Sequence, residues 1–298
     1  MDEPLDAPAS ARLARRLDAR VLLPLFVCYL LCYLDRSNLA NAKADVSRAL
    51  SLDTAQYAFA SSCFQIGYIL FEVPANLVLA RARPSLWLGA LVAAFGAIAA
   101  LSALARSYAE LVAARIFLGI AEAGFPPGAL FYLSLFYRPE ELGARNALFL
   151  VAGPLANAAG AVVAYFLLEV RAGGLAGWQW LFVIEGAPAV AMGLVLALAL
   201  PDAPAAARFL SEDEKALAAR RVPVAPGGAH GGGGGGGGGG HGGWRDALAM
   251  LRSPVVVAFC VLNVSTNIAS YGIGAFLPAI VAELTATAPR RPSARRSC

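Results

Sequence analysis

The most regular feature of the chain is a series of apolar blocks, each about twenty or more residues long, separated by shorter polar stretches. A bilayer core of ~30 Å requires about 20 apolar helical residues, so each block predicts a membrane-spanning helix. The pattern predicts seven spans, at approximately 21 to the mid-40s, 57–79, 86–104, 111–137, 146–168, 178–200 and 255–284.

The polar stretches between and around these blocks divide the chain into five predicted parts. The short tract Ser211–Glu214 has the form of a capping box and predicts a helix start, whereas Gly231–Gly240 is typical of a flexible linker. The predicted parts are an irregular or surface-lying N-terminal tail (1–20), a six-helix half (21–200), a loop with a poly-Gly linker (201–253), a seventh helix (254–285) and an irregular basic tail (286–298).

Composition agrees with a membrane protein. The sequence is 58% hydrophobic and only 15% charged, against about a quarter charged in soluble domains. The predicted fold class is therefore an all-α multi-pass membrane protein, and the net charge of +4 does not indicate nucleic acid as a partner. Because the sequence has no nucleophile elbow, zinc-ligand spacing or nucleotide-binding loop, it predicts no enzyme, no cofactor and no metal site.

Basic residues set the expected orientation of the spans. With the N-terminus in the cytoplasm, cytoplasmic segments hold fourteen Lys and Arg residues and the opposite side holds four before the C-terminal tail. This bias predicts a cytoplasmic N-terminus. The basic residues of the tail itself would then lie outside, against the rule, which indicates that the chain is incomplete after its seventh span.

Two pairs of charged residues interrupt the apolar blocks. Arg115 and Glu122 lie seven residues apart in the fourth predicted span and share a helix face, and Asp35 and Arg36 lie well inside the first. A charge at the centre of a span costs about 2.5–3.5 kcal/mol on insertion scales and is usually functional. The residues alone leave two interpretations open, a structural ion pair that locks a bundle and a pair that handles protons or anions.

Six motifs occur in order over residues 20–280 and resemble the major facilitator superfamily, in particular its anion:cation symporter branch of allantoate, nicotinate, tartrate and phthalate permeases. They are Leu34–Leu39, Gly67–Asn76, Ala114–Pro127, Gly177–Pro188, Phe209–Lys215 and Tyr271–Pro278. Members of this family have twelve spans in two six-helix halves, so the resemblance implies the first half of a major facilitator bundle plus one helix of the second.

The resemblance implies secondary active transport of small organic anions (carboxylates) by alternating access, with proton symport more expected than sodium coupling, in a plasma membrane rather than an organelle. It assigns substrate binding to Arg36, Tyr68 and Asn38, and proton coupling to Asp35 and Glu122 with Arg115 as their internal partner. The positions of Glu72 and Glu185 in the sequence favour structural roles over proton coupling. Glu185 is expected near the membrane interface.

One departure from the family concerns the connection between the second and third spans, which normally carries an acidic residue beside its arginines. Here only Arg81 and Arg83 are present, which predicts an altered gate. Two other classes of function stay open. A seven-helix receptor also has seven spans, and a truncated or regulatory fragment would not transport on its own.

Overall fold

A computed structural model describes residues 7–79 and 81–222, together with residues 253, 254, 257, 258, 261, 262 and 265. The chain separates into two units, 1–236 and 237–298, and the six spans described here lie in the first. The predicted poly-Gly linker and basic tail, and most of the seventh span, lie outside the described residues.

Six helices among the described residues are long and apolar enough to cross a membrane, and they match the first six predicted spans. Their bounds are Pro8–Asn41, Thr54–Leu79, Pro84–Ser102, Tyr108–Ser134, Pro139–Leu167 and Gly177–Ala199. The part of the chain that the structure describes is almost entirely helical, which confirms the predicted fold class.

The first span is longer than the sequence predicts. Helix α1 (Ala7–Leu17) continues through one π-helical turn, Asp18–Leu22, into α2 (Leu23–Asn41). Leu13 and Leu17 are fully buried while the arginines of α1 are exposed. An irregular tail is therefore the wrong prediction for these residues, which are helical, because their amphipathic pattern is short and its buried stripe consists of Leu13, Ala14 and Leu17.

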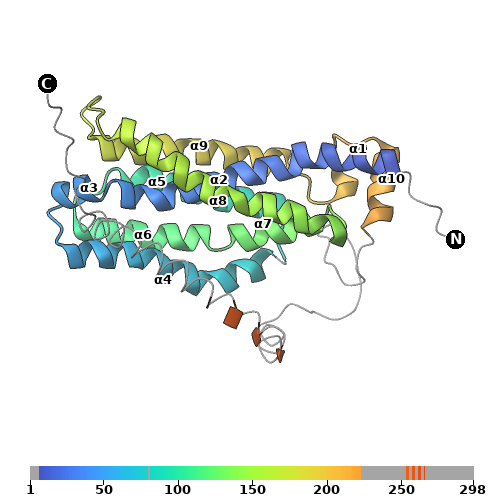
Figure 1. Cartoon of the computed structure of the whole chain (residues 1–298), viewed down its shortest axis with the longest axis horizontal. Coiled ribbons are helices and arrows are strands. Elements are labelled where there is room, and N and C mark those ends of the chain that lie inside the picture. Colours follow the sequence, from blue (N-terminus) through green and yellow to red (C-terminus); the bar gives the residue numbers. More distant parts are fainter. Residues whose placement is uncertain are drawn as a thin grey trace, which may run out of the picture. The chain divides into compact units, whose positions relative to one another are not determined.

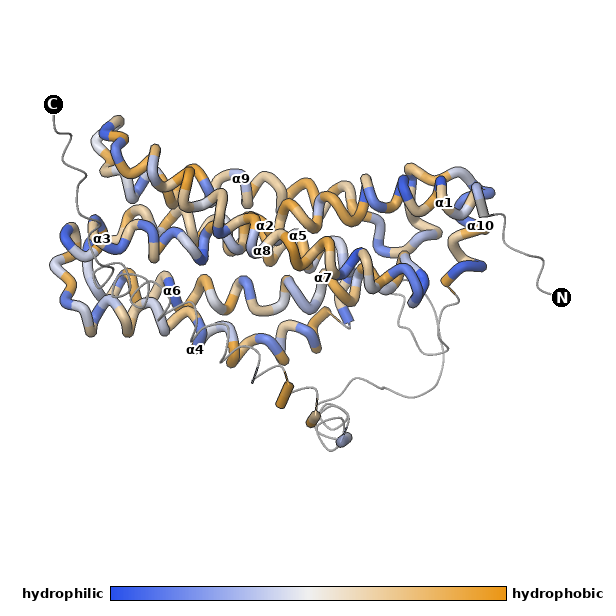
Figure 2. Tube along the Cα trace, viewed as in Figure 1, coloured by the Kyte–Doolittle hydropathy of each residue, from blue (hydrophilic) through white to orange (hydrophobic). Residues whose placement is uncertain are grey.

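The spans pack in pairs, and the most extensive contacts are α5 (Pro84–Ser102) with α9 (Gly177–Ala199), α4 (Thr54–Leu79) with α6 (Tyr108–Glu122), and α2 with α8 (Pro139–Leu167) (Figure 1). Figure 2 shows hydrophobic residues dominating α5 and α9, and hydrophilic residues at α1, α3 (Lys43–Ala49) and α10 (Glu212–Arg221).

Two glycines allow α4 and α6 to approach closely. A Cβ atom on Gly119 would overlap the backbone of α4 at Phe64, and one on Gly67 would overlap the backbone of α6 at Ile116. Small residues at such crossings let membrane helices pack backbone against backbone. This contact brings Tyr68 on α4 next to the charged helix α6.

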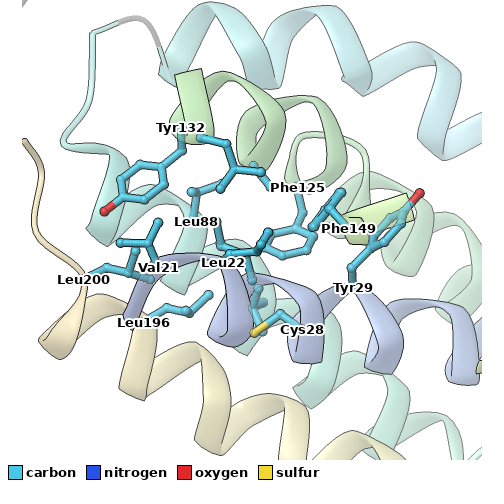
Figure 3. Packing of buried hydrophobic residues seen from close by; sticks show 14 of the residues in the cluster. Val21, Leu22, Cys28, Tyr29, Leu88, Phe125, Tyr132, Phe149, Leu196 and Leu200 are labelled. Atoms are coloured by element: carbon cyan, nitrogen blue, oxygen red, sulfur yellow. The ribbon is translucent and has the colours of Figure 1, made fainter. Parts of the chain in front are cut away.

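The interior of the bundle is filled by hydrophobic side chains from all six described spans. Figure 3 shows this packing, in which the Tyr29 and Phe149 rings stack with centroids 4.3 Å apart and join α2 to α8. Phe125 and Tyr132 enter the same cluster from α7 (Phe125–Ser134), and Leu196 enters it from α9.

The fourth span is broken close to its centre, as the two consecutive prolines predict. Helix α6 ends at Glu122, and α7 begins at Phe125 with Pro126 and Pro127 in its first turn, where a missing N–H costs nothing. The break places the Glu122 side chain at a helix end, against α2.

Polar contacts tie α1, α8 and α10 together at one end of the bundle. Arg145 on α8 donates through Nε to Asp18 at 2.9 Å, and Arg16 pairs with Glu214 at 2.9 Å. The buried Arg221 pairs with Glu141 at the start of α8. The predicted capping box is confirmed, because the Ser211 hydroxyl accepts from the Glu214 N–H.

The arginine after the second span is not without an acid. Arg83 Nε lies 2.8 Å from Asp202 Oδ2, and Asp202 Oδ1 accepts from the Ser85 hydroxyl at 2.6 Å and from the Ser85 N–H at 3.1 Å. The connection itself lacks an acid, as the sequence shows, and the carboxylate comes instead from the segment after the sixth span, 119 residues away.

Candidate functional site

The four charged residues of the first and fourth spans form two ion pairs between helices. Arg36 Nε lies 2.7 Å from Glu122 Oε2, and Arg115 Nη1 lies 3.9 Å from Asp35 Oδ2. Both pairs join α2 to α6. Asp35 and Arg36 are adjacent on α2, and Arg115 and Glu122 lie two turns apart on α6. Each residue of α2 therefore pairs with a different residue of α6.

Arg36 lies among aromatic rings. Its guanidinium carbon is 5.0 Å from the ring centroids of Tyr33, Phe64 and Tyr68, all within the range of cation–π attraction. Its side chain keeps 23% of its area exposed, whereas Glu122 is fully buried. Within the described residues, Arg36 Nη2 has no hydrogen-bond partner. This guanidinium can therefore donate a hydrogen bond to a further anion or carbonyl oxygen.

The second pair is more deeply buried and looser. Arg115 and Asp35 each expose only 3% of the side chain, and the Arg115 guanidinium lies 5.3 Å from the Phe182 ring centroid on α9. In the part of the chain that is described, both Asp35 oxygens and Arg115 Nε and Nη2 lack hydrogen-bond partners. The charges attract each other without making the short contact that Arg36 and Glu122 share.

A third polar contact extends the site from α2 to α9. The Asn38 amide Nδ2 donates to Glu185 Oε2 at 2.5 Å, and both side chains are buried. Glu185 faces the interior of the bundle, because the α9 segment carrying it packs against α2 and α5. Asn38, expected to contact substrate, is fully buried and engaged by Glu185.

The structure brings the predicted residues Asp35, Arg36, Glu122 and Arg115 together, and Tyr68 contributes a ring beside Arg36. The sequence reasoning missed Tyr33 and Phe64, and it named Glu185 without its contact to Asn38. Tyr33 precedes Arg36 by three positions and Phe64 precedes Tyr68 by four, which is the spacing of neighbours on one helix face. That spacing could have identified both rings. A single sequence offers no comparable signal for the α2–α9 contact.

Chemically, the arrangement suits exchange of charge partners rather than covalent catalysis. A guanidinium offers paired N–H donors that match a carboxylate, and the buried acid beside it can be exchanged for another anion. Among the described residues, no group of three or more His, Cys, Asp or Glu side chains is placed to hold a metal ion.

Comparison with known proteins relates the chain to transporters. It is 35% identical over 291 residues to the MFS transporter prlL of Fungal sp. (95% of this chain, 57% of the relative) and 31% identical over 280 residues to the "Putative tartrate transporter" of Agrobacterium vitis (94% and 62%). It is 38% identical over 200 residues to the metabolite transport protein NicT of Pseudomonas putida (65% and 45%). The chain thus spans about half the length of these curated relatives.

Solved structures share the fold. A bacterial homologue of the human lysosomal transporter Spinster, in an inward-facing and occupied conformation, aligns with TM-score 0.56 at 22% identity, covering 61% of this chain and 44% of that one. The proton:xylose symporter XylE aligns with TM-score 0.56 at 17% identity, covering 70% and 50%. The family model of the Major Facilitator Superfamily matches residues 25–288, and the chain belongs to this family of membrane transporters, not to an enzyme family.

Proposed function

We propose that this chain supplies the N-terminal half of a proton-coupled symporter for small organic anions, with Arg36 as the contact for the substrate carboxylate. The proposal rests on the exposure and the surroundings of the Arg36 side chain. It is a partly exposed guanidinium inside a membrane span, with three aromatic rings around it and a single buried carboxylate as its partner. A charge kept in a span at this cost is a functional group by default.

The coupling follows from competition for that guanidinium. While Glu122 is ionised, its 2.7 Å contact holds Arg36 and disfavours a second anion. A proton on Glu122 removes the negative charge, so that Arg36 binds the incoming carboxylate and proton and anion are carried together. Asp35 and Arg115 form the second proton-sensitive pair, and the Tyr68 hydroxyl is a further donor beside the anion.

Relatives support the choice of substrate and ion. One relative is named as a tartrate transporter and another as a metabolite transport protein, and a structural neighbour is a proton:xylose symporter. We infer a small carboxylate substrate, protons rather than sodium, a cytoplasmic N-terminus and a plasma-membrane location. Fourteen Lys and Arg residues on one side of the spans, against four on the other before the C-terminal tail, support the orientation.

The proposal is tested by uptake of labelled tartrate into proteoliposomes under an imposed proton gradient. Two proteins are compared, the chain itself and a graft in which residues 1–222 replace the matching part of the Agrobacterium vitis relative. In the graft, Arg36→Gln is expected to abolish uptake, and Glu122→Gln is expected to make uptake insensitive to the proton gradient.

A matched control is Arg48→Gln, which removes one arginine from an exposed pair with Asp45 at the end of α3. This variant is expected to leave uptake unchanged. Normal uptake by Arg36→Gln would remove Arg36 from the mechanism, and normal proton drive in Glu122→Gln would favour a purely structural ion pair.

A further inference from the structure

The contact between Asn38 and Glu185 has no role in the partner exchange at Arg36, yet it places a third carboxyl inside the bundle. Glu185 is 5% exposed and Asn38 is fully buried. The Asn38 amide donates to one carboxyl oxygen, Oε2, at 2.5 Å. The other oxygen, Oε1, is buried and without a hydrogen-bond partner among the described residues.

The elements around Glu185 offer it no cation of its own. Helix α5, which packs along α9, contains no ionisable side chain, and Glu185 is the only charged residue of α9. The acids and the arginine of α8 lie in its first two turns. From α2 come Asp35 and Arg36, and from α6 comes Arg115, but these arginines already pair with Glu122 and Asp35.

A count of charges indicates that this interior favours the uptake of one proton. The carboxyls are Asp35, Glu122 and Glu185, and the guanidiniums are Arg36 and Arg115. With every group ionised the sum is two positive and three negative charges, a net charge of −1. An uncompensated charge buried in a span costs several kcal/mol, and a carboxyl in that position takes up a proton instead.

Local partners indicate which carboxyl carries that proton. Asp35 and Glu122 each have a guanidinium partner, which favours their ionised forms, whereas the partner of Glu185 is a neutral amide. The Asn38 Oδ1 atom is also buried without a donor in the described part of the chain. A protonated Glu185 supplies one O–H donor at a contact that otherwise has unmatched acceptors.

We propose that Glu185 is held as the neutral carboxylic acid and that Asn38 is its hydrogen-bonding partner rather than a direct substrate contact. Asn38 lies one helical turn from Asp35 on α2, so the pair links the neutral acid to the helix that carries the proton-sensitive Asp35. The role in coupling rests on the proposed transport function, whereas the protonation state does not.

Infrared spectroscopy of the full chain in lipid at neutral pH tests this directly, because a neutral carboxylic acid has a C=O stretch distinct from that of a carboxylate. We expect such a band in the unmutated chain, shifted by ¹³C-labelled glutamate and not by ¹³C-labelled aspartate. We expect Glu185→Gln to lose it, since glutamine has the shape of the neutral acid. The exposed Glu169→Gln control is expected to keep it.

Several results would overturn the proposal. They are absence of the band in the unmutated chain, a band shifted by labelled aspartate, or a band that survives Glu185→Gln. The isotope result needs no substitution and excludes Asp35 as the neutral acid even where a variant folds poorly, and Glu185→Gln then distinguishes Glu185 from Glu122. Since the measurement reads the proton and not transport, failure of tartrate uptake would remove the proposed function and leave this assignment standing.

Discussion

Removing the Asp202 carboxylate is expected to destabilise the contact between the start of α5 and the segment after α9. Ser85 lies in the first turn of α5, where backbone N–H groups have no helical partner. Asp202 Oδ1 accepts from that N–H at 3.1 Å and from the Ser85 hydroxyl at 2.6 Å, while Oδ2 accepts from Arg83 at 2.8 Å. The carboxylate therefore caps a helix that begins more than a hundred residues earlier.

The size of the effect follows from these three hydrogen bonds. A bond to a charged group contributes about 1.5–3 kcal/mol when buried, and less at a partly exposed site such as this one. Leaving the Ser85 N–H without its acceptor adds to the loss. We expect Asp202→Ala to lower the free energy of unfolding by about 2–3 kcal/mol, or roughly 4–10 °C in melting temperature for a chain of this size.

Thermal unfolding in detergent, followed by tryptophan fluorescence, measures this loss. Asp202→Asn keeps an acceptor for Ser85 but lacks the charge, so we expect it to lose about half as much. The control Asp213→Ala removes the same charge from an exposed position on α10 and is expected to change stability by less than about 0.5 kcal/mol. Unfolding of Asp202→Ala at the temperature of the unmutated chain would refute the capping argument.

The same contact predicts a dependence on pH. Burial opposes ionisation of Asp202, but the hydrogen bonds from Ser85 and Arg83 outweigh it and lower the pKa of this carboxyl. A folded pKa below the unfolded value near ~3.9 stabilises the fold above that value, and the contribution is lost as the pH falls through the folded pKa. Unfolding curves of the unmutated chain and Asp202→Asn should therefore converge below about pH 4, and a constant difference down to pH 2 would contradict the assignment.

Four further substitutions test the packing. Gly119→Val should destabilise the α4–α6 contact by several kcal/mol, because its side chain would overlap the backbone at Phe64; an unchanged melting temperature would contradict this close approach. Tyr132→Phe should cost about 1 kcal/mol in the same melts, since its hydroxyl donates to the Pro201 carbonyl and the ring stays buried. Arg221→Met should lower the free energy of unfolding by about 3 kcal/mol, because Arg221 is buried with its partner Glu141. Arg16→Ala should lower it by less than about 1 kcal/mol, because Arg16 is exposed, and equal losses would be evidence against the buried contact.

The sequence predicts the spans and the depth of Asp35 and Arg36 because both depend on local properties. Hydropathy over some twenty residues identifies a span, and consecutive prolines at 126 and 127 identify the break in the fourth one. Helical periodicity likewise assigns Arg115 and Glu122 to one face. Each of these inferences uses information within one helix, and the structure agrees with them for the first six spans, for the break and for the position of Asp35 and Arg36 within α2.

Partners on different helices could not be predicted in the same way. Periodicity shows that Arg115 and Glu122 share a face, but not that each meets a residue of α2. The Asn38–Glu185 contact joins residues 147 positions apart, and its existence depends on the rotation of α9 against α2. Helix rotation is set by packing between spans, such as the glycine contacts of α5 with α9, and one sequence does not specify it.

A charge reversal distinguishes a structural role of the Arg36–Glu122 pair from a role in transport. Arg36→Glu alone places two carboxylates together inside the bundle, and Glu122→Arg alone places two guanidiniums there, so each should be strongly destabilising. The double variant restores opposite charges at the same two positions. If the pair only locks α2 to α6, melting temperature and tartrate uptake of the graft should recover together.

If the guanidinium is the anion contact, its location decides the outcome. In the double variant it extends from the fully buried position 122 on α6, and the partly exposed position among Tyr33, Phe64 and Tyr68 holds a carboxylate instead. That carboxylate repels an incoming anion. We therefore expect melting temperature to recover while uptake stays absent, and recovery of uptake in proportion to stability would assign the pair a structural role.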